Sequence, residues 1–403
     1  MTAPKLRFKE FDGDWSPYVL KDFVSFRKGK GISKADISED GINECIRYGE
    51  LYTTYGQVIT KVQSKTHVSK SECVLSQGGD VLIPASGETQ IDIATASCIL
   101  KEDVILSGDL NVLSHKENGE WLAYYLSSAK KLDIAQLAQG NSVVHLYSSQ
   151  LKDLKINKPS KAEQTKIASF LSSVDEKISQ LTQKHELLSQ YKQGMMQKLF
   201  SQQIRFKADD GSEFGEWEEK TLGSLGVFKS GQGFPEKYQG GKTGVPFFKV
   251  SDMNTYGNEK RMVVANNYVD ADSILEMKVK VILDESIIFA KVGAAVFLER
   301  KRLATNFLID NNMMAFTPDP KLNINFIKQF LDTIKFSNFV QVGALPSYNA
   351  GDLAIIPIHI PCVVEQTKIA NFLSAIDQKI DVVAQQIEQT KQWKKGLLQQ
   401  MFV

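Results

Sequence analysis

The stretch Glu163-Gln-Thr-Lys-Ile-Ala168 returns near the end of the chain as Glu365-Gln-Thr-Lys-Ile-Ala370, and this repeat decides the fold. The match continues without a gap to Phe200 and Phe402, at a constant offset of 365 − 163 = 202 residues. Of the 38 aligned positions, 19 are identical. A match of this length predicts an internal duplication.

Both copies have the apolar spacing of a long helix. Apolar residues recur in alternating steps of four and three, which gives a helix one narrow apolar stripe, the pattern of a coiled-coil seam. At 1.5 Å per residue, such a helix would be about 57 Å long. His185, Lys192, Thr390 and Lys394 interrupt the stripe, so we expect imperfect pairing toward the C-terminal ends. The predicted seam residues are Ile167, Leu171, Val174, Ile178, Leu181, Leu188, Ile369, Leu373, Ile376, Ile380, Val383 and Ile387.

The shared register favours mutual packing of the two helices. In a chain that duplicates a domain together with its helix, an internal twofold axis buries both stripes at once. We therefore expect an antiparallel coiled coil with an internal pseudo-twofold repeat. The alternative is that each helix lies on its own domain as an unrelated surface helix.

The composition is that of a folded, soluble protein. The chain has 403 residues, of which 42% are hydrophobic and 24% charged, and this length favours two domains or more. The net charge of +1 gives no global excess of positive charge for nucleic-acid binding. The four cysteines have no Cys-x-x-Cys spacing, the N-terminal residues lack a signal-peptide core, and no apolar run reaches membrane length. We expect a cytoplasmic protein with no membrane partner.

The duplication extends well beyond the helices. Gly13-Asp-Trp15 is matched 202 residues later by Gly215-Glu-Trp217, but between such anchors the two halves differ almost completely. Each half mixes short β-like runs, Gly and Asn turns and a helix, which predicts a mixed α/β or α+β domain. The predicted boundaries are 1–158 for the first domain, 159–200 for the central helix, 201–214 for a linker, 215–360 for the second domain and 361–403 for the C-terminal helix.

The sequence contains no recognisable catalytic or metal-binding motif. Gly29-Lys-Gly31 and Gly231-Gln-Gly233 lack the third glycine and the helix of a dinucleotide site. The five histidines have no metal-ligand spacing, and the Asn-Pro-Pro-Tyr or Asp-Pro-Pro-Tyr tetrapeptide of amino-methyltransferases is missing. We therefore predict neither catalytic residues nor a metal site, and no cofactor bound to this chain.

Two segments combine aromatic, polar and basic side chains in a way that suits nucleic-acid recognition. They are Arg47–Tyr55 and Phe247–Asn254, although ordinary strand core is the alternative for their apolar members. Arg can read guanine edges, Asn adenine edges, and Lys, Ser, Thr or Tyr can hold phosphates. Two loops, Gln139–Ser142 and Gly343–Asn349, precede equivalent strands and could approach a backbone closely. The candidate DNA-binding residues are Arg47, Tyr48, Tyr52, Thr53, Thr54, Tyr55, Asn141, Ser142, Lys249, Ser251, Asn254, Ser347 and Tyr348.

The repeated motif resembles that of the specificity subunits of type I restriction-modification systems. It reads Pro-x-x-x-Glu-Gln-x-x-Ile-Ala-x-x-Leu-x-x-x-Asp-x-x-Ile and spans Pro159–Ile178 and Pro361–Ile380. The openings Trp15–Gly31 and Trp217–Gly233 match the same family. The resemblance implies two variable target-recognition domains, each followed by a repeated helix. It transfers no base contact residue by residue.

The resemblance also implies the partners. The chain would be a non-catalytic subunit that holds two methyltransferase (modification) subunits, and optionally two restriction subunits, on double-stranded DNA with a bipartite target. Such a complex methylates adenine at N6 and cleaves unmodified DNA. S-adenosylmethionine, ATP and Mg²⁺ would bind the partner subunits.

A partner used twice requires two equivalent landing sites. We expect docking on identical residues of the two helices, which lie mostly off the stripe. Two alternatives come from other classes: a coiled-coil scaffold that joins two protein-interaction modules without binding DNA, and a free-standing methyltransferase. The predicted docking residues are Glu163, Gln164, Lys166, Asp175, Lys177, Glu365, Gln366, Lys368, Asp377 and Lys379.

Overall fold

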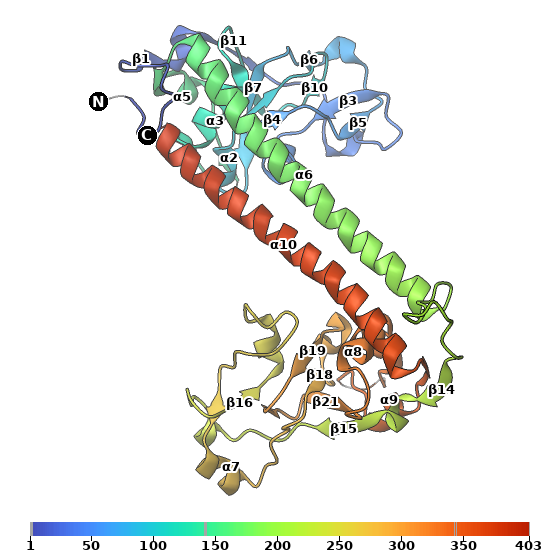
Figure 1. Ribbon diagram of the computed structural model, residues 1–403. Coiled ribbons are helices and arrows are strands. Elements are labelled where there is room, and N and C mark those ends of the chain that lie inside the picture. Colours follow the sequence, from blue (N-terminus) through green and yellow to red (C-terminus); the bar gives the residue numbers. More distant parts are fainter. Residues whose placement is uncertain (1–2, 141–142, 342, 344, 403) are drawn as a thin grey trace. The chain divides into compact units, whose positions relative to one another are not determined.

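The computed structural model describes residues 3–140, 143–341, 343 and 345–402. The chain divides into two compact units, residues 1–184 together with 383–403, and residues 185–382. The boundaries of these units fall inside the two long helices, so each helix contributes one end to each unit (Figure 1). The predicted division instead keeps each long helix whole, as a segment of its own at 159–200 and 361–403.

A five-stranded sheet forms the centre of the first unit. Its order is β2-β11-β7-β9-β4, and neighbouring strands are antiparallel except β9 and β4. A smaller sheet, β5-β3-β10-β6, contains the parallel pair β3 and β10. Two further antiparallel pairs join β1 to β13 and β8 to β12. The strands are β1 (Ser16–Val19), β2 (Val24–Lys28), β3 (Asn43–Ile46), β4 (Val58–Ile59), β5 (Ser64–Thr66), β6 (Val74–Leu75), β7 (Asp80–Pro84), β8 (Ser86–Gly87), β9 (Ser97–Ile99), β10 (Ile105–Leu106), β11 (Leu110–His115), β12 (Val144–His145) and β13 (Lys155–Lys158).

The helix α3 joins this sheet to the long helices. Asn118 caps it, because its side chain accepts a hydrogen bond from the Trp121 amide at 2.8 Å. Trp121 is fully buried in one apolar cluster with Leu113 of the sheet and Leu171 of the long helix α6. The unit therefore has a layer of sheet, a layer of short helices and a layer of long helix. Its short helices are α1 (Glu50–Thr53), α2 (Gln90–Ile93), α3 (Gly119–Ser127), α4 (Lys131–Leu137) and α5 (Ser148–Lys152).

The second unit repeats this plan with fewer strands. A four-stranded antiparallel sheet has the order β15-β21-β18-β19, and a smaller sheet, β17-β16-β20, contains the parallel pair β16 and β20. Asn323 caps α8 by accepting a hydrogen bond from the Phe326 amide at 3.1 Å, as Asn118 caps α3. The elements are β14 (Glu218–Thr221), β15 (Gly226–Ser230), β16 (Val245–Phe248), β17 (Tyr268–Val269), α7 (Ala271–Met277), β18 (Ser286–Ala290), β19 (Lys301–Ala304), β20 (Leu308–Ile309), β21 (Met313–Pro318), α8 (Ile324–Thr333), α9 (Ala350–Ala354) and β22 (Pro357–Ile360), with β14 paired to β22.

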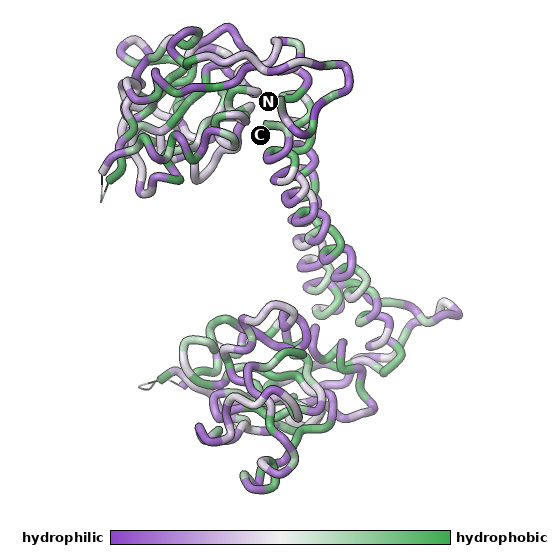
Figure 2. Tube along the Cα trace, turned by 90° about the vertical axis from the view of Figure 1, so that its left-hand side faces the viewer, coloured by the Kyte–Doolittle hydropathy of each residue, from purple (hydrophilic) through white to green (hydrophobic). Residues whose placement is uncertain are grey.

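The two long helices expected from the apolar spacing are present and pack together. They are α6 (Lys161–Phe200) and α10 (Val363–Met401), and hydrophilic and hydrophobic residues alternate along both (Figure 2). In the first unit, Leu171 near the start of α6 shares a core with Met401 at the end of α10. In the second unit, Leu199 at the end of α6 shares a core with Leu373 near the start of α10.

Most of the predicted seam residues have buried side chains. Ile178, Leu188 and Ile380 are half-buried instead. The buried members are Ile167, Leu171, Val174, Leu181, Ile369, Leu373, Ile376, Val383 and Ile387.

Two lysines that interrupt the apolar stripe form ion pairs between the helices. In the first unit, the Lys394 ammonium lies 2.5 Å from Asp175 Oδ1, and the Tyr124 hydroxyl donates to Asp175 Oδ2 at 2.6 Å. In the second unit, the Lys192 ammonium lies 2.7 Å from Asp377 Oδ1. The two pairs occupy equivalent positions, since 394 − 192 and 377 − 175 both equal 202. Charge pairing therefore replaces apolar packing at these points.

Candidate nucleic-acid interface

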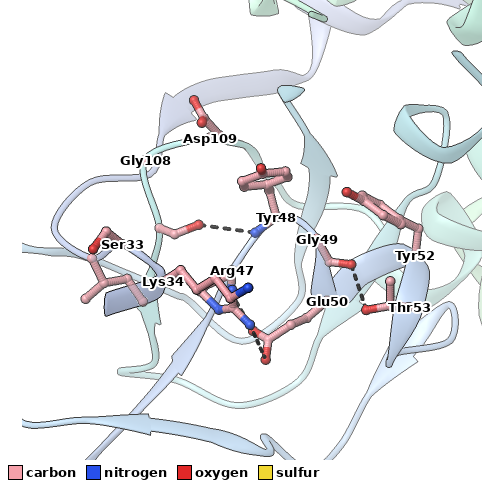
Figure 3. Close-up of a pocket in the computed structure, with 12 residues that line it drawn as sticks. Ser33, Lys34, Arg47, Tyr48, Gly49, Glu50, Tyr52, Thr53, Gly108 and Asp109 are labelled. Carbon is pink, nitrogen blue, oxygen red and sulfur yellow. Dashed lines mark hydrogen bonds and ion pairs between the residues drawn. The ribbon is translucent and has the colours of Figure 1, made fainter. Parts of the chain in front are cut away.

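A groove of about 530 Å³ lies in the first unit, where the parallel strands β3 and β10 end (Figure 3). Parallel strands end at the same edge of a sheet, so the residues that follow them meet there. Arg47 and Tyr48 directly follow β3, and Ser107 directly follows β10. The Tyr48 amide donates a hydrogen bond to Ser107 Oγ at 3.2 Å, which ties the two segments together.

The main chain of Arg47 is fixed by a hydrogen bond, while its side chain remains 28% exposed to the groove. The Arg47 amide donates to Glu50 Oε2 at 2.7 Å, and the buried Glu50 carboxylate also accepts a hydrogen bond from Ser64. Arg47 Nη2 lies 3.9 Å from Glu50 Oε1, which is a long contact for an ion pair. Arg47 Nε is buried and has no hydrogen-bond partner within the described part of the chain.

Four predicted DNA-binding residues line this groove. Burial raises the pKa of Tyr52, so its hydroxyl remains protonated at neutral pH and can donate a hydrogen bond. The Thr53 hydroxyl donates to Gly49 O at 2.9 Å. A ligand in the groove would meet a guanidinium, two phenols and a hydroxyl. The four residues are Arg47, Tyr48, Tyr52 and Thr53.

The groove excludes two residues of the predicted set and adds others that the sequence did not indicate. Thr54 is exposed but does not line it, and Tyr55 packs against a core cluster while its hydroxyl accepts a hydrogen bond from the Gln63 amide at 2.9 Å. Lys34 and Asp109 come from loops distant in sequence and do line it. These two could not be found from Arg47–Tyr55 alone, because strand pairing brings them there.

In the second unit, the predicted residues lie around the end of β16. The Lys249 ammonium donates to Gln239 Oε1 at 2.8 Å and lies 5.2 Å from the centre of the Phe234 ring. Ser251 is exposed, and the exposed Asn254 accepts a hydrogen bond from Arg300 at 2.6 Å. The apolar members of this segment, Phe247 and Phe248, are strand core.

The predicted DNA-binding residues of the two loops are half-buried or buried, or lie outside the described residues. Tyr348, which was predicted to be among the DNA-binding residues, is buried, and its hydroxyl donates to the Ala290 carbonyl, so its side chain is part of the core of the second unit. Ser347 is half-buried and makes strand-like main-chain bridges with Val292 and Gln341. The remaining pair, Asn141 and Ser142, lies outside the described residues.

The predicted docking set contains four residues whose side chains are buried. Burial of these four side chains favours the alternative that they cap the helices rather than bind a partner directly. The side-chain amide of Gln164, for example, donates from Nε2 to the Pro159 carbonyl at 3.1 Å, and the side-chain amide of Gln366 makes the same contact with the Pro361 carbonyl at 2.8 Å. These side chains hold the first turn of each long helix in place. The four residues are Glu163, Gln164, Glu365 and Gln366, each at most 1% exposed.

The other docking candidates lie nearer the surface. Lys166 forms an exposed ion pair with Glu10, and Lys368 forms one with Asp209. Asp175 and Asp377 make the ion pairs between helices described above. In contrast, Lys177 and Lys379 are exposed, and no ion pair of either is recorded in the described part of the chain.

The described residues contain neither a metal-ligand cluster nor a membrane-spanning helix. No group of three or more His, Cys, Asp or Glu side chains there is arranged to hold a metal ion. Across the same residues, every helix is too short or too polar to cross a membrane.

Comparison with known sequences gives one consistent result. The chain matches the family described as "Type I restriction modification DNA specificity domain" twice, over residues 12–190 and 215–392. A Methanocaldococcus jannaschii protein, named for the specificity subunit of the type I restriction enzyme MjaX, is 30% identical over 98% of this chain and 94% of its own length. The MjaVIII specificity subunit of the same organism is 24% identical over 97% of this chain and 94% of its own length.

Solved structures share the fold. The S subunit of a type I restriction-modification system from M. genitalium has a TM-score of 0.62 and 16% identity, covering 100% of this chain and 99% of that one. A chain from a study of complex assembly and conformational transition of the type I R-M system has a TM-score of 0.57 and 15% identity, covering 96% and 97%. From the two family matches and the full-length relatives, the chain belongs to the family of type I restriction-modification DNA specificity proteins.

Proposed function

We propose that this chain is the DNA specificity subunit of a type I restriction-modification complex, with each half reading one half of a bipartite target. The observation that carries the proposal is one scaffold present twice with different interiors. A repeated frame provides two readers of the same shape, and different side chains let each reader satisfy different base edges. The relatives described above favour this function over a coiled-coil scaffold that does not bind DNA.

In this function, α6 and α10 form an antiparallel coiled coil related by an internal pseudo-twofold axis. The packing within each unit supports this arrangement, because the start of one helix shares a core with the end of the other. The equivalent ion pairs of Lys394 with Asp175 and Lys192 with Asp377 support it as well. A twofold scaffold suits a target with two half-sites.

The chain acts without catalytic residues of its own and works in the cytoplasm beside DNA. It holds two methyltransferase subunits, and restriction subunits when they are present. S-adenosylmethionine, ATP and Mg²⁺ bind those partners. The near-neutral charge of this chain agrees with such a division, since the partners can supply much of the phosphate neutralisation that DNA affinity requires.

A domain exchange tests whether each domain recognises its half of the target independently. Residues 14–158 are replaced by the corresponding domain of another specificity subunit, and the complex with its methyltransferase is expressed in a host without adenine methylation. Sequencing of N6-methyladenine should show a new sequence in one half of the target and an unchanged second half. Replacement of 215–360 is the matched control and should change the other half only. A change of both halves by either exchange contradicts the proposal.

The methyltransferase subunits dock on the exposed residues that the two helices share. Lys177 and Lys379 are the best placed, because they are exposed and equivalent. Reversal of both charges, Lys177→Glu with Lys379→Glu, should reduce the number of methyltransferase subunits recovered per chain in a pull-down. Lys184→Glu, an exposed lysine of α6 outside the identical set, is the control. Unchanged stoichiometry in the double variant argues against this docking surface.

A further inference from the structure

The strand ends that carry the groove of the first unit have a counterpart in the second unit. In the first, Cys45 of β3 pairs in parallel with Ile105 of β10. In the second, Phe247 of β16 pairs in parallel with Leu308 of β20. The offsets are 247 − 45 = 202 and 308 − 105 = 203, so these are the same two strands in each copy of the duplication. The residues that follow the strands therefore occupy equivalent positions.

The segment after the first of these strands is fastened in the same way in both units. The Arg47 amide donates to the Glu50 carboxylate at 2.7 Å, and the Lys249 amide donates to the Asp252 carboxylate at 2.7 Å. Both pairs are 202 residues apart, and both carboxylates are buried. A buried acidic residue three positions later thus fixes the main chain of a cation in each unit.

The floor of each site is also the same. A Cβ atom on Gly29 would lie 1.9 Å from the Ser107 carbonyl oxygen, and one on Gly231 would lie 1.7 Å from the Asp310 carbonyl oxygen. Only glycine permits main chains to approach this closely. The next residue in each unit, Lys30 or Gln232, donates its amide to the last residue of the second parallel strand at 2.9 Å.

The side chains around these shared frames differ. Arg47 in one unit stands where Lys249 stands in the other, and the polar residue after the second strand is Ser107 in one and Asp310 in the other. A site for a ligand common to both halves would keep its side chains, as the identical helix positions do. A fixed frame with changed side chains is what two readers of different sequences require.

We infer that the segments that follow these two equivalent strand pairs are the base-reading sites of the proposed specificity subunit, with Arg47 and Lys249 as the base-contacting cations. The inference rests on the proposed DNA-reading function. The forked guanidinium of Arg47, whose side chain is 28% exposed, matches the O6 and N7 acceptors of guanine. Lys249 presents a single ammonium, held by Gln239 and the Phe234 ring, and acts as a point donor to a base acceptor.

A selection experiment tests this assignment. The chain assembled with its methyltransferase subunits is incubated with double-stranded oligonucleotides randomised across the target, and bound molecules are sequenced. Arg47→Ala should lower the preference for one or two base pairs of the first half by about 5- to 150-fold, the equivalent of about 1–3 kcal/mol. The second half should remain unchanged. Lys249→Ala should relax the second half alone.

Two further variants separate base reading from charge. Arg47→Lys keeps the charge but loses the fork, so it should retain affinity and still lose the preference. Lys152→Ala removes an exposed cation of α5 outside the groove and should leave both half-sites intact. The main-chain hydrogen bond from residue 47 to Glu50 survives every substitution of Arg47, and melting curves check that the variants fold.

The outcomes distinguish a failure of this assignment from a failure of the proposed function. If the parent complex selects a bipartite sequence but Arg47→Ala and Lys249→Ala only weaken binding uniformly, the two cations contact phosphates and the inference is overturned. If either variant relaxes both halves together, the inference also fails. If the parent complex selects no sequence at all, the proposed function fails and the inference with it.

Discussion

Arg7 forms a bidentate ion pair with Glu163: its Nε donates to one carboxylate oxygen at 2.7 Å and its Nη2 donates to the other at 2.8 Å. The Trp15 indole donates to the same carboxylate at 3.3 Å. Arg205 holds Glu365 in the same way, at 3.1 and 2.8 Å. In each unit, this contact fastens the segment that enters the domain to the first turn of the helix that leaves it.

Loss of the Glu163 carboxylate should therefore destabilise the first unit. Glu163→Ala leaves Arg7 beside a buried space without its partner, and breaking such a pair costs about 3 kcal/mol. The urea midpoint of the first unfolding transition, followed by tryptophan fluorescence, should fall accordingly. Glu10→Ala removes only an exposed partner of Lys166, and its unfolding curve should overlay that of the parent. Equal shifts in the two variants would contradict the assignment.

The ion pair between Lys192 and Asp377 should show measurable coupling. Both side chains are about one-quarter exposed or less, so solvent screens the pair only in part. A double-mutant cycle with Lys192→Ala and Asp377→Ala in urea unfolding should give a coupling free energy of about 1–2 kcal/mol. The exposed pair of Lys391 and Glu388 is the control and should give a value near zero. Coupling no larger than in the control would mean that the pair contributes nothing to the helix interface.

The sequence predicted the long helices because their apolar spacing is a local property. The sequence did not reveal the ion pair between Arg7 and Glu163. Arg7 and Arg205 are 198 residues apart rather than 202, since the stretch from Phe206 to Gly215 is four residues longer than that from Phe8 to Gly13. The pair therefore drops out of any fixed-offset comparison. Glu163 was consequently placed among the partner-docking residues, although its side chain is buried.

Some of the residues that line the groove could be predicted from the sequence, and others could not. Arg47 and Lys249 were both among the expected DNA-binding residues, and the acidic residue three positions after each was a visible signal. The equivalence of the two cations becomes clear only in the structure, where each follows the first strand of an equivalent parallel pair. Lys34 and Asp109 reach the groove through tertiary pairing, which no local pattern encodes. Tyr348 looked suitable for DNA because aromatic loop residues and buried aromatic anchors look alike in a sequence.

His115 should make the first unit less stable in mild acid. Burial lowers the pKa of His115 in the folded state, against the opposing charges of Asp80 and Glu117. The unfolded value is about 6.5. Below that pH the unfolded chain takes up the proton first, so stability falls from pH 6.5 down to the folded pKa and is unaffected above. His115→Gln should lose less stability than the parent between pH 7.5 and 5.5.

The measurement is the urea midpoint at three or four pH values in that range. His67→Gln is the matched control, because His67 is exposed beside Asp40. It should follow the pH profile of the parent. A parent and a His115→Gln variant with parallel profiles would show that His115 does not titrate differently in the folded and unfolded states.

The chain should tolerate circular permutation. The Leu6 amide donates to the Gln400 carbonyl at 2.9 Å, and the Ile204 amide donates to the Lys198 carbonyl at 3.2 Å. The acceptors are 400 − 198 = 202 residues apart, so the start of the chain docks on the end of α10 as the linker docks on the end of α6. In the linker this return takes the three residues 201–203. Joining the present ends would supply six, residues 403 and 1–5.

A permuted chain that begins at Gly211 and ends at Asp210 should therefore fold and keep the parent's DNA target. The new ends fall in a turn closed by a hydrogen bond from the Ala208 amide to the Ser212 carbonyl, where the Asp209 side chain is 96% exposed. Circular dichroism and the urea midpoint report folding, and methylation mapping with the partner subunits reports the target. A second permutant opened between Lys177 and Ile178 interrupts α6 and should unfold at lower urea. Equal stability of the two permutants, or a changed target in the first, would show that the ends are not equivalent to the linker.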